Sequence, residues 1–362
     1  MRITAVRTGI LSVPLKKPFK TAVRSVDAVN DVIVAVETDG EFIGYGEAPP
    51  TGVITGDTTG AILGAVQDHL CHALVGRDAE DLDGNVKAVE GALVGNTSAK
   101  AALDIALHDL WAQSLGAPLY RLFGGVSTAI ETDMTISVNE PDEMVQDALD
   151  AVQQGYRVLK IKVGKNSAKD FERLKAIRDA VGYEVTIRID ANQGWKPDEA
   201  VRILDQLENA GIALELVEQP VHSKDLDGMA YVTARTSVPV VADESIWYAA
   251  DAMEIFRRKA ADIVNIKLMK CGGLAEARRI VALSQVWGAQ VMVGSMLEGK
   301  VSVTAAAHLA AAYGVVTKID LDGPLLCSSD PVDGGAEFIG PGIRLNRDAG
   351  LGVRSLEGVR WF

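Results

Sequence analysis

Residues 158–190 read VLKIKVGKNSAKDFERLKAIRDAVGYEVTIRID, and this stretch determines the fold. The short apolar runs at 158–163 and 185–190 have the length of buried strands, and the residues between them have helical spacing. A strand, a helix and a second strand of this length form a parallel βαβ unit. Each run carries a charged residue at its C-terminal end, Lys162 in the first and Asp190 in the second.

The same unit recurs along the rest of the chain. Candidate strands lie at 131–138, 158–163, 185–190, 214–218, 238–243, 262–267, 290–295 and 316–322. Polar residues mark their C-terminal ends at intervals of 24–28 residues, namely Thr135, Lys162, Asp190, Glu218, Asp243, Lys267, Ser295 and Asp320. Eight such units predict an α/β protein with a (β/α)8 barrel of the TIM type. A doubly wound open sheet is the alternative, but it would not be expected to place a polar residue at nearly every strand end.

The first 125 residues follow a different pattern. Residues 3–13 alternate as in a strand, and residues 31–38 and 41–47 predict a hairpin around Asp39-Gly40. Three helices are predicted near 57–75, 79–94 and 97–115. The chain therefore changes after Gly124-Gly125 from a mixed α+β segment to the barrel.

Composition narrows the choice of partners. The net charge of −13 argues against nucleic acid and anionic membranes, since both require a basic face. No apolar run reaches the roughly 18 residues that span a bilayer, and residues 1–14 lack the apolar core of a signal peptide. The three cysteines are scattered and odd in number, as in reduced thiols. We therefore expect a cytoplasmic protein, and we expect it to form a homo-oligomer.

Carboxylates end three successive strands. The C-terminal ends of barrel strands meet at one mouth, so Asp190, Glu218 and Asp243 are expected to converge there. Three converging carboxylates repel one another unless a divalent cation lies between them. A site made only of oxygen ligands selects a hard ion, Mg²⁺, with Mn²⁺ as a substitute. No His or Cys falls among these positions, so zinc is not indicated.

Lysines accompany the carboxylates. Lys160 and Lys162 face the same side of their strand because side chains alternate, and Lys267 ends the sixth strand, across the barrel from the second. A substrate above the metal would have Lys162 and Lys267 on opposite faces, as a 1,1-proton transfer beside a carboxylate requires. Lys160 and the metal would stabilise the enediolate. Neighbouring cations and burial are expected to lower the lysine pKa values, so that one amine is neutral at about pH 7.

These residues carry a resemblance to a known family. The segments 160–162 (KIK), 190–192 (DAN), 218–220 (EQP), 242–245 (ADES) and 265–267 (NIK) resemble motifs of the enolase superfamily, muconate-lactonizing subgroup. The resemblance implies an α+β cap, built from residues 1–125 and 341–362, that closes over a catalytic barrel at 126–340. It also implies one of four activities: muconate cycloisomerase, o-succinylbenzoate synthase, N-acylamino acid racemase or dipeptide epimerase.

The eighth strand distinguishes among these activities. Asp320 and Asp322 are two residues apart and are predicted to share one face, where two carboxylates call for a cation. An Asp-x-Asp at this place resembles the dipeptide epimerases, in which it holds the α-ammonium group of the substrate. A dipeptide is therefore the expected substrate. N-acylamino acid racemase, o-succinylbenzoate synthase and epimerase of other dipeptides are the alternatives.

Two segments of the predicted cap narrow the substrate further. Residues 18–25 and 48–57 resemble the specificity loops of the L-Ala-D/L-Glu epimerases in this subgroup. The resemblance implies that Arg24 receives an acidic side chain through a bidentate contact; the alternative is an exposed surface arginine. Thr135, Ser295 and Glu298 lie at strand ends and are expected to line the substrate pocket.

Overall fold

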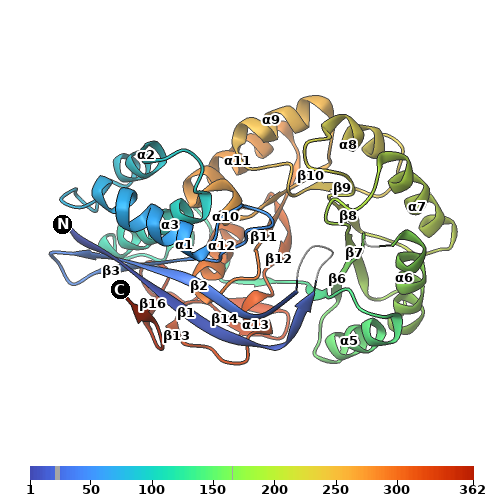
Figure 1. Ribbon diagram of the computed structural model, residues 1–362, viewed down its shortest axis with the longest axis horizontal. Helices are drawn as coiled ribbons and strands as arrows, with labels where there is room; N and C mark the ends of the chain where they lie inside the picture. Colours follow the sequence, from blue (N-terminus) through green and yellow to red (C-terminus); the bar gives the residue numbers. More distant parts are fainter. Residues whose placement is uncertain (21–24, 165) are drawn as a thin grey trace.

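The computed structural model describes residues 1–20, 25–164 and 166–362, with a sheet-and-helix layer beside a barrel (Figure 1). The layer contains an antiparallel sheet in the order β17-β1-β2-β3. Its strands are β1 (Ile3–Lys20), β2 (Ser25–Thr38), β3 (Ile43–Ala48) and, from the far end of the chain, β17 (Arg360–Trp361). The predicted hairpin is confirmed, because β2 and β3 pair on either side of Asp39-Gly40.

Helices cover one face of this sheet. They are α1 (Thr59–Ala65), continued by η1 (Val66–Leu70) and η2 (Cys71–Ala73), then α2 (Leu82–Ala92) and α3 (Thr97–Ser114). The three predicted helices are thereby confirmed. Helix α3 approaches β3 so closely that a Cβ atom on Gly46 would lie 1.8 Å from the carbonyl oxygen of Ala102. Only glycine permits this distance between strand and helix.

Eight parallel strands form the barrel and follow one another in sequence order from β5 to β12. They are β5 (Met134–Ile136), β6 (Val158–Lys162), β7 (Thr186–Asp190), β8 (Leu216–Glu218), β9 (Val240–Ala242), β10 (Ile263–Ile266), β11 (Gln290–Gly294) and β12 (Val316–Asp320). All eight predicted strands are confirmed. The sheet is nearly closed, and the backbone N–H of Asp133, just before β5, donates to the carbonyl of Ile319 in β12 at 3.2 Å.

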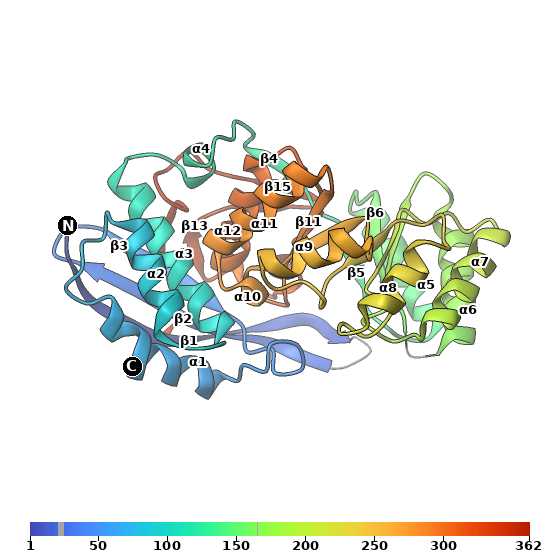
Figure 2. The same cartoon turned by 90° about the horizontal axis from the view of Figure 1, so that it is seen from above.

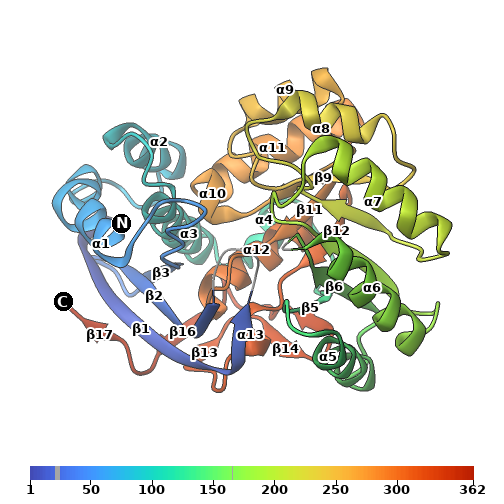
Figure 3. The same ribbon diagram turned by 45° about the vertical axis from the view of Figure 1, so that its right-hand side comes forward.

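In the part of the chain that the structure describes, seven helices surround the barrel, and their arrangement can be followed in Figure 3. They are α5 (Pro141–Gln153), α6 (Ser167–Val181), α7 (Pro197–Asn209), α8 (Leu226–Thr233), α9 (Ala249–Arg258), α11 (Leu274–Trp287) and α12 (Lys300–Ala312). The connections contain the short helices α4 (Leu119–Leu122), α10 (Leu268–Cys271) and α13 (Gly323–Leu326). Within the described ranges, no helix combines the length and apolar character needed to cross a membrane.

The barrel interior is layered. Leu216, Val241, Ile263 and Met292 come from four neighbouring strands and form a buried apolar cluster. Glu218 follows Leu216 by two residues, so it points to the same side but lies closer to the C-terminal end of its strand. Polar groups therefore sit above an apolar floor, at the end of the barrel where TIM-barrel enzymes carry their active sites.

The C-terminal part of the chain contacts both halves of the molecule. On the barrel side, β15 (Gly342–Arg344) pairs with β4 (Ala129–Glu131) and β14 (Glu337–Ile339), while β13 (Val332–Gly334) pairs with β16 (Val353–Leu356). On the other side, the Asp109 carboxylate of α3 accepts from the N–H groups of Tyr45 in β3, at 3.1 Å, and Leu351, at 2.7 Å. The last strand, β17, completes the N-terminal sheet.

The N-terminal sheet also packs against the barrel. Figure 2 shows β1 and β2 running alongside it. Their inward-facing apolar residues form a buried cluster with two barrel residues, Leu297 and Cys327; the sheet residues are Leu11, Val13, Val29 and Ile33. This contact brings the sheet to the turn that follows β11.

Candidate active site

Three carboxylates lie at the C-terminal ends of neighbouring strands. Asp190 ends β7, Glu218 ends β8, and Asp243 directly follows β9. Asp190 and Glu218 are paired in register. One oxygen atom from each of the three carboxylates lies within 4.8 Å of the other two, and all three residues are buried. The predicted convergence of these side chains is therefore what the structure shows.

The charge balance of this cluster fits a divalent cation. Burial, and then the neighbouring carboxylate of Asp190, raise the pKa of Glu218 to about 7. A buried carboxylate with a raised pKa gains if further positive charge is placed beside it. Three carboxylates without nitrogen or sulfur ligands suit a hard ion such as Mg²⁺. Asp190, Glu218 and Asp243 are thus the residues that could hold a metal.

Three lysines surround the carboxylates. Lys160 and Lys162 both point into the barrel from β6, as strand alternation predicts. Lys160 Nζ lies 2.6 Å from Glu218 Oε2 and 2.7 Å from Asp320 Oδ2, and Lys162 Nζ lies 2.6 Å from Asp190 Oδ2. Lys267 follows β10, four strands away from β6, and its Nζ lies 2.8 Å from Asp243 Oδ2.

The expectation that cations and burial lower the lysine pKa values is wrong for two of these residues. Burial acts in that direction on Lys267, but the carboxylates of Asp243 and Glu218 outweigh it, and the pKa is raised. The pKa of Lys160 is likewise raised, because Asp320 and Glu218 outweigh its burial. A metal ion bound to these carboxylates would counteract their influence and lower the pKa values of the lysines again.

Two acidic residues form another wall of the site. Asp320 ends β12 and is held by Lys160, and Asp322 accepts a hydrogen bond from the backbone N–H of Thr135 at 2.7 Å. The predicted strand ends at Asp320, and Asp322 is instead the N-cap residue just before α13, where Pro324 occupies the first turn. Both carboxylates nevertheless face the same cavity. Burial and the charge of Asp320 raise the pKa of Asp322 to about 6.

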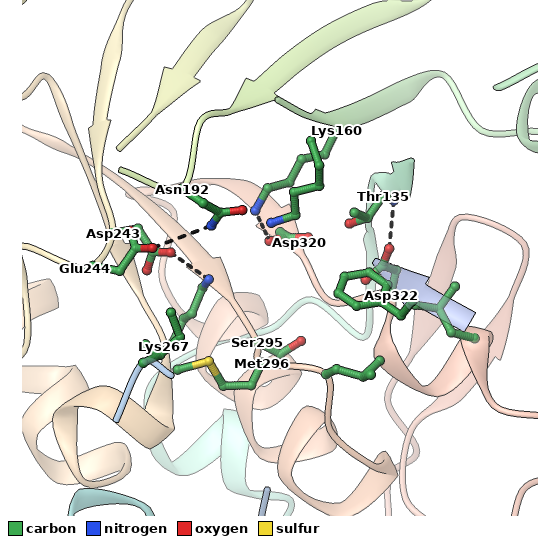
Figure 4. Close-up of a pocket in the computed structure, with 15 residues that line it drawn as sticks. Thr135, Lys160, Asn192, Asp243, Glu244, Lys267, Ser295, Met296, Asp320 and Asp322 are labelled. Carbon is green, nitrogen blue, oxygen red and sulfur yellow. Dashed lines mark hydrogen bonds and ion pairs between the residues drawn. The ribbon is translucent and has the colours of Figure 1, made fainter. Parts of the chain in front are cut away.

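These groups surround one cavity (Figure 4). Its polar lining contains Thr135, Lys160, Lys162, Asn192, Asp243, Glu244, Lys267, Ser295, Asp320 and Asp322. Its apolar lining contains Phe19, Ile54, Met296, Leu297 and Leu326. Glu298 was expected to line this cavity, but it is not among the described residues that do so. Its carboxylate turns back to accept from the backbone N–H of Met296 at 2.7 Å.

The N-terminal layer contributes to the cavity from both predicted specificity segments. Phe19 lies in the first and Ile54 in the second, and both line the cavity. Arg24, predicted as the anion receptor, lies outside the described residues. Lys20, in the same segment, donates its Nζ to Asn139 Oδ1 at 2.9 Å.

The structure adds Lys270, which the sequence analysis missed, and it gives contacts to Asn265 and Glu244, which the sequence analysis quoted within motifs without a role. Asn265 donates to Glu218 Oε1 at 2.8 Å, and it lies two residues before Lys267, on the same face of the strand. Lys270 Nζ lies 2.5 Å from Asp243 Oδ1 and 3.1 Å from the carbonyl of Asn265. Glu244 lines the cavity, and burial together with Asp243 raises its pKa to about 8. The sequence did contain a signal for Lys270: it follows Lys267 by three residues, about one helical turn, so the two side chains can lie on the same side.

Comparisons with known proteins agree with this architecture. Residues 4–124 match the model of the mandelate racemase / muconate lactonizing enzyme N-terminal domain, and residues 143–358 match the enolase C-terminal domain-like model. The chain is 54% identical to an L-Ala-D/L-Glu epimerase of Clostridium acetobutylicum, over 98% of this chain and 99% of that protein.

Solved structures give the same result. A substrate-liganded L-Ala-D/L-Glu epimerase from Bacillus subtilis superposes with a TM-score of 0.97 at 45% identity, covering 98% of this chain and 99% of that one. A dipeptide epimerase from Enterococcus faecalis, complexed with Mg and L-Leu-L-Tyr, superposes with a TM-score of 0.95 at 38% identity, covering 98% and 100%. With both domain models matched and the barrel site assembled, this chain belongs to the mandelate racemase / muconate lactonizing enzyme family of the enolase superfamily.

Proposed function

We propose that this protein is a Mg²⁺-dependent dipeptide epimerase and that its substrate is L-Ala-D/L-Glu. One observation carries the proposal: Lys162 and Lys267 come from opposite sides of the barrel and line one cavity, beside a cluster of three carboxylates. The relative from Clostridium acetobutylicum, named as an L-Ala-D/L-Glu epimerase, supports the choice of substrate. The Enterococcus faecalis complex with Mg and a dipeptide supports the choice of ion.

Each residue has a role in the proposed reaction. Asp190, Glu218 and Asp243 hold Mg²⁺, which supplies a Lewis acid for the substrate carboxylate when it is bound. Lys162 and Lys267 act as the two bases: one removes the α-proton of the second residue, and the other delivers a proton to the opposite face. Lys160, which is only 1% exposed, balances the negative charge that develops on the carboxylate oxygens as the α-proton leaves.

Asp320 and Asp322 distinguish a dipeptide from an N-acylated amino acid. Asp320 is engaged by Lys160, which leaves Asp322 to receive the α-ammonium group of the dipeptide. The raised pKa of Asp322 supports this role, because a buried carboxylate beside a second one is stabilised by a cation. N-acylamino acid racemase and o-succinylbenzoate synthase substrates carry no such cation, so these alternatives leave the pair unused.

The second residue of the dipeptide is the less constrained part. The proposed preference for Glu or Asp depends on Arg24, which stays a prediction from the sequence. A second candidate is epimerisation of dipeptides with an apolar second residue, favoured by the apolar lining from Phe19, Ile54 and Met296. A dipeptide library incubated in D₂O separates the two, since deuterium enters the α-position only of accepted substrates. Preferential labelling of Ala-Leu over Ala-Glu would reject the Arg24 assignment alone.

Further features are proposed with the activity. We propose that residues 1–125 and 341–362 act as a cap on the catalytic barrel at 126–340, and that Mn²⁺ can replace Mg²⁺. A cytoplasmic location is proposed too. Its support is that the three cysteines, all within the described residues, are free, as is usual in a reducing compartment. A homo-oligomer is proposed as well. With L-Ala-D/L-Glu as substrate, recycling of cell-wall peptides is the setting we propose.

A further inference from the structure

Two acidic residues are buried where the N-terminal sheet meets the barrel. Glu47 of β3 pairs in register with Ile33 of β2, so Asp31, two residues from Ile33, lies on the same face of the sheet. That face is otherwise apolar around them, with Leu11 and Val29 as neighbours in the buried cluster. Asp31 is 1% exposed and Glu47 is 0% exposed. Burying two acidic side chains destabilises the fold unless hydrogen-bond donors contact their oxygen atoms.

The donors come from the start of barrel helix α12. The backbone N–H of Gly299 donates to Asp31 Oδ2 at 2.9 Å. The backbone N–H of Ser302 donates to Glu47 Oε2 at 3.0 Å, and the Ser302 hydroxyl donates to the same oxygen at 3.3 Å. The turn just before Gly299 contains Ser295, Met296 and Leu297, which line the catalytic cavity. The two acids therefore bind the segment that carries one wall of the active site.

The two carboxyl groups also contact each other. Each is a hydrogen-bond partner of the other, and a hydrogen bond between two carboxyl groups requires one of them to carry a proton. The donors from Ser302 favour the anion at Glu47, and Gly299 occupies Oδ2 of Asp31. Oδ1 of Asp31 is then free to carry the proton. Glu47 Oε1, a buried atom without a hydrogen-bond donor among the described residues, can accept it.

We propose that Asp31 and Glu47 are positioning residues: by sharing one proton they hold Gly299 and Ser302, and so fix the 295–297 wall of the catalytic cavity against the N-terminal sheet. The geometry of the donors carries this proposal. Burial, and then the charge of Glu47, raise the pKa of Asp31 well above its usual range, which agrees with a proton retained there. The kinetic part rests on the proposed function, whereas the positioning itself can be measured without turnover.

The surroundings determine how the pair responds to pH. Glu298 faces it from the barrel, and its charge disfavours a second negative charge on the pair. The Cys327 thiol also faces it, and burial together with the two acids raises the thiol pKa, so that the thiol stays neutral. Lys16 and Lys300 line a cavity together with Glu47, but both are engaged elsewhere: Lys16 Nζ donates to the carbonyl of Leu325 at 2.8 Å, and Lys300 Nζ to Asp330 Oδ2 at 2.6 Å. Because the pKa of Asp31 is raised by folding, its stabilising proton is present at low pH. The proton is lost as pH rises through the folded pKa, and the two carboxylates then repel each other.

A matched pair of variants tests the proposal. In D31N the amide oxygen can accept from Gly299 and the amide nitrogen can donate to Glu47, with no proton to lose. In D31L the side chain has similar size but neither group. The first readout is hydrogen–deuterium exchange of the peptide covering residues 295–302, corrected for intrinsic exchange rates and followed over the whole pH range in which the protein stays folded. The second is the separation of KM from kcat over the same range.

In the wild type, corrected exchange in this peptide and KM for the dipeptide should both rise as the pH rises through the folded pKa of Asp31. D31N should match the wild type within about twofold below that rise and show no rise of its own, while D31L should exchange at least about tenfold faster throughout. Equal pH responses of wild type and D31N would overturn the proposal, and this comparison holds even if D31L does not fold. If no dipeptide is turned over, the proposed function fails, but the exchange data still decide the positioning role.

Discussion

Lys162 and Asp190 form an ion pair across two neighbouring barrel strands, with Nζ 2.6 Å from Oδ2, and they occupy paired positions in β6 and β7. On the opposite side, Lys267 lies 2.8 Å from Asp243 in the same way. Each lysine proposed for proton transfer thus contacts one carboxylate proposed for the metal. The positions of the two bases and of the metal site are therefore determined by the same side chains.

Removing a charge from the triad should weaken metal binding. Asp243→Asn takes one anionic ligand from a buried site, and we expect the affinity for Mg²⁺ to fall by more than about 100-fold, with loss of turnover. Isothermal titration with Mg²⁺ measures the affinity directly. Asp179→Asn, the same change on an exposed side chain of α6, is the matched control and should bind as the wild type does. Full turnover of the wild type after dialysis against excess EDTA would rule out a catalytic metal.

The two lysines should be separable by isotope exchange. Lys162→Ala and Lys267→Ala should each reduce epimerisation by at least about 1000-fold, the scale of a lost general base. Each variant should still exchange the α-proton of one epimer with D₂O, because the remaining amine reaches one face of the substrate. NMR of each pure epimer in D₂O shows which face is served. Epimerisation by either variant at the wild-type rate would exclude the two-base scheme.

Charge at the amino end of the substrate should matter through Asp322. Asp322→Asn keeps an acceptor for the Thr135 N–H but removes the anion, so KM for L-Ala-L-Glu should rise by the equivalent of about 1.5–3 kcal/mol. N-acetylation of the dipeptide should cost the wild type at least as much, because a buried carboxylate is left unpaired. If the wild type has equal kcat/KM for the free and the N-acetylated dipeptide, the N-acylamino acid racemase alternative is favoured.

A buried histidine should make the fold sensitive to acid. His308 of α12 accepts from the backbone N–H of Tyr120 at 3.0 Å, and burial lowers its pKa to about 3. Because the unfolded chain binds this proton at higher pH, stability is complete above about pH 6.5 and is lost as pH falls, by up to about 2 kcal/mol at pH 5. His308→Gln keeps an acceptor without titrating. Urea unfolding at pH 8 and pH 5 should show a smaller acid loss for the variant, and an equal loss would contradict this assignment.

The barrel was predictable because its signal is periodic. Lys162, Asp190, Glu218, Asp243 and Lys267 recur at the interval of one βα unit, and strand alternation then fixes which side chains face inward. The same rule fails where a strand ends. Alternation placed Asp322 in a strand, but the helix α13, with Pro324 in its first turn, begins directly after this residue. Glu298 was expected in the pocket, but it lies in a turn, where alternation does not apply.

Interactions between distant segments were not predictable in this way. The lysine pKa values depend on distances to Asp243 and Glu218 that the sequence does not specify. The pairing of Asp31 with Glu47 could not be predicted either. In the sequence they are ordinary strand residues, and their contacts form only where the sheet packs against α12. Their partners, Gly299 and Ser302, lie more than 250 residues away in the chain. Packing between the two halves of the molecule creates these sites.

The central claim is tested most directly by incubating the wild-type protein with L-Ala-L-Glu and Mg²⁺ in D₂O and following the product by NMR and chiral chromatography. A two-base epimerase predicts L-Ala-D-Glu that carries one deuterium at the α-carbon of Glu, while the α-proton of Ala is unchanged. The account is contradicted if neither this dipeptide nor any member of a dipeptide library exchanges its α-proton while N-succinyl amino acids are racemised.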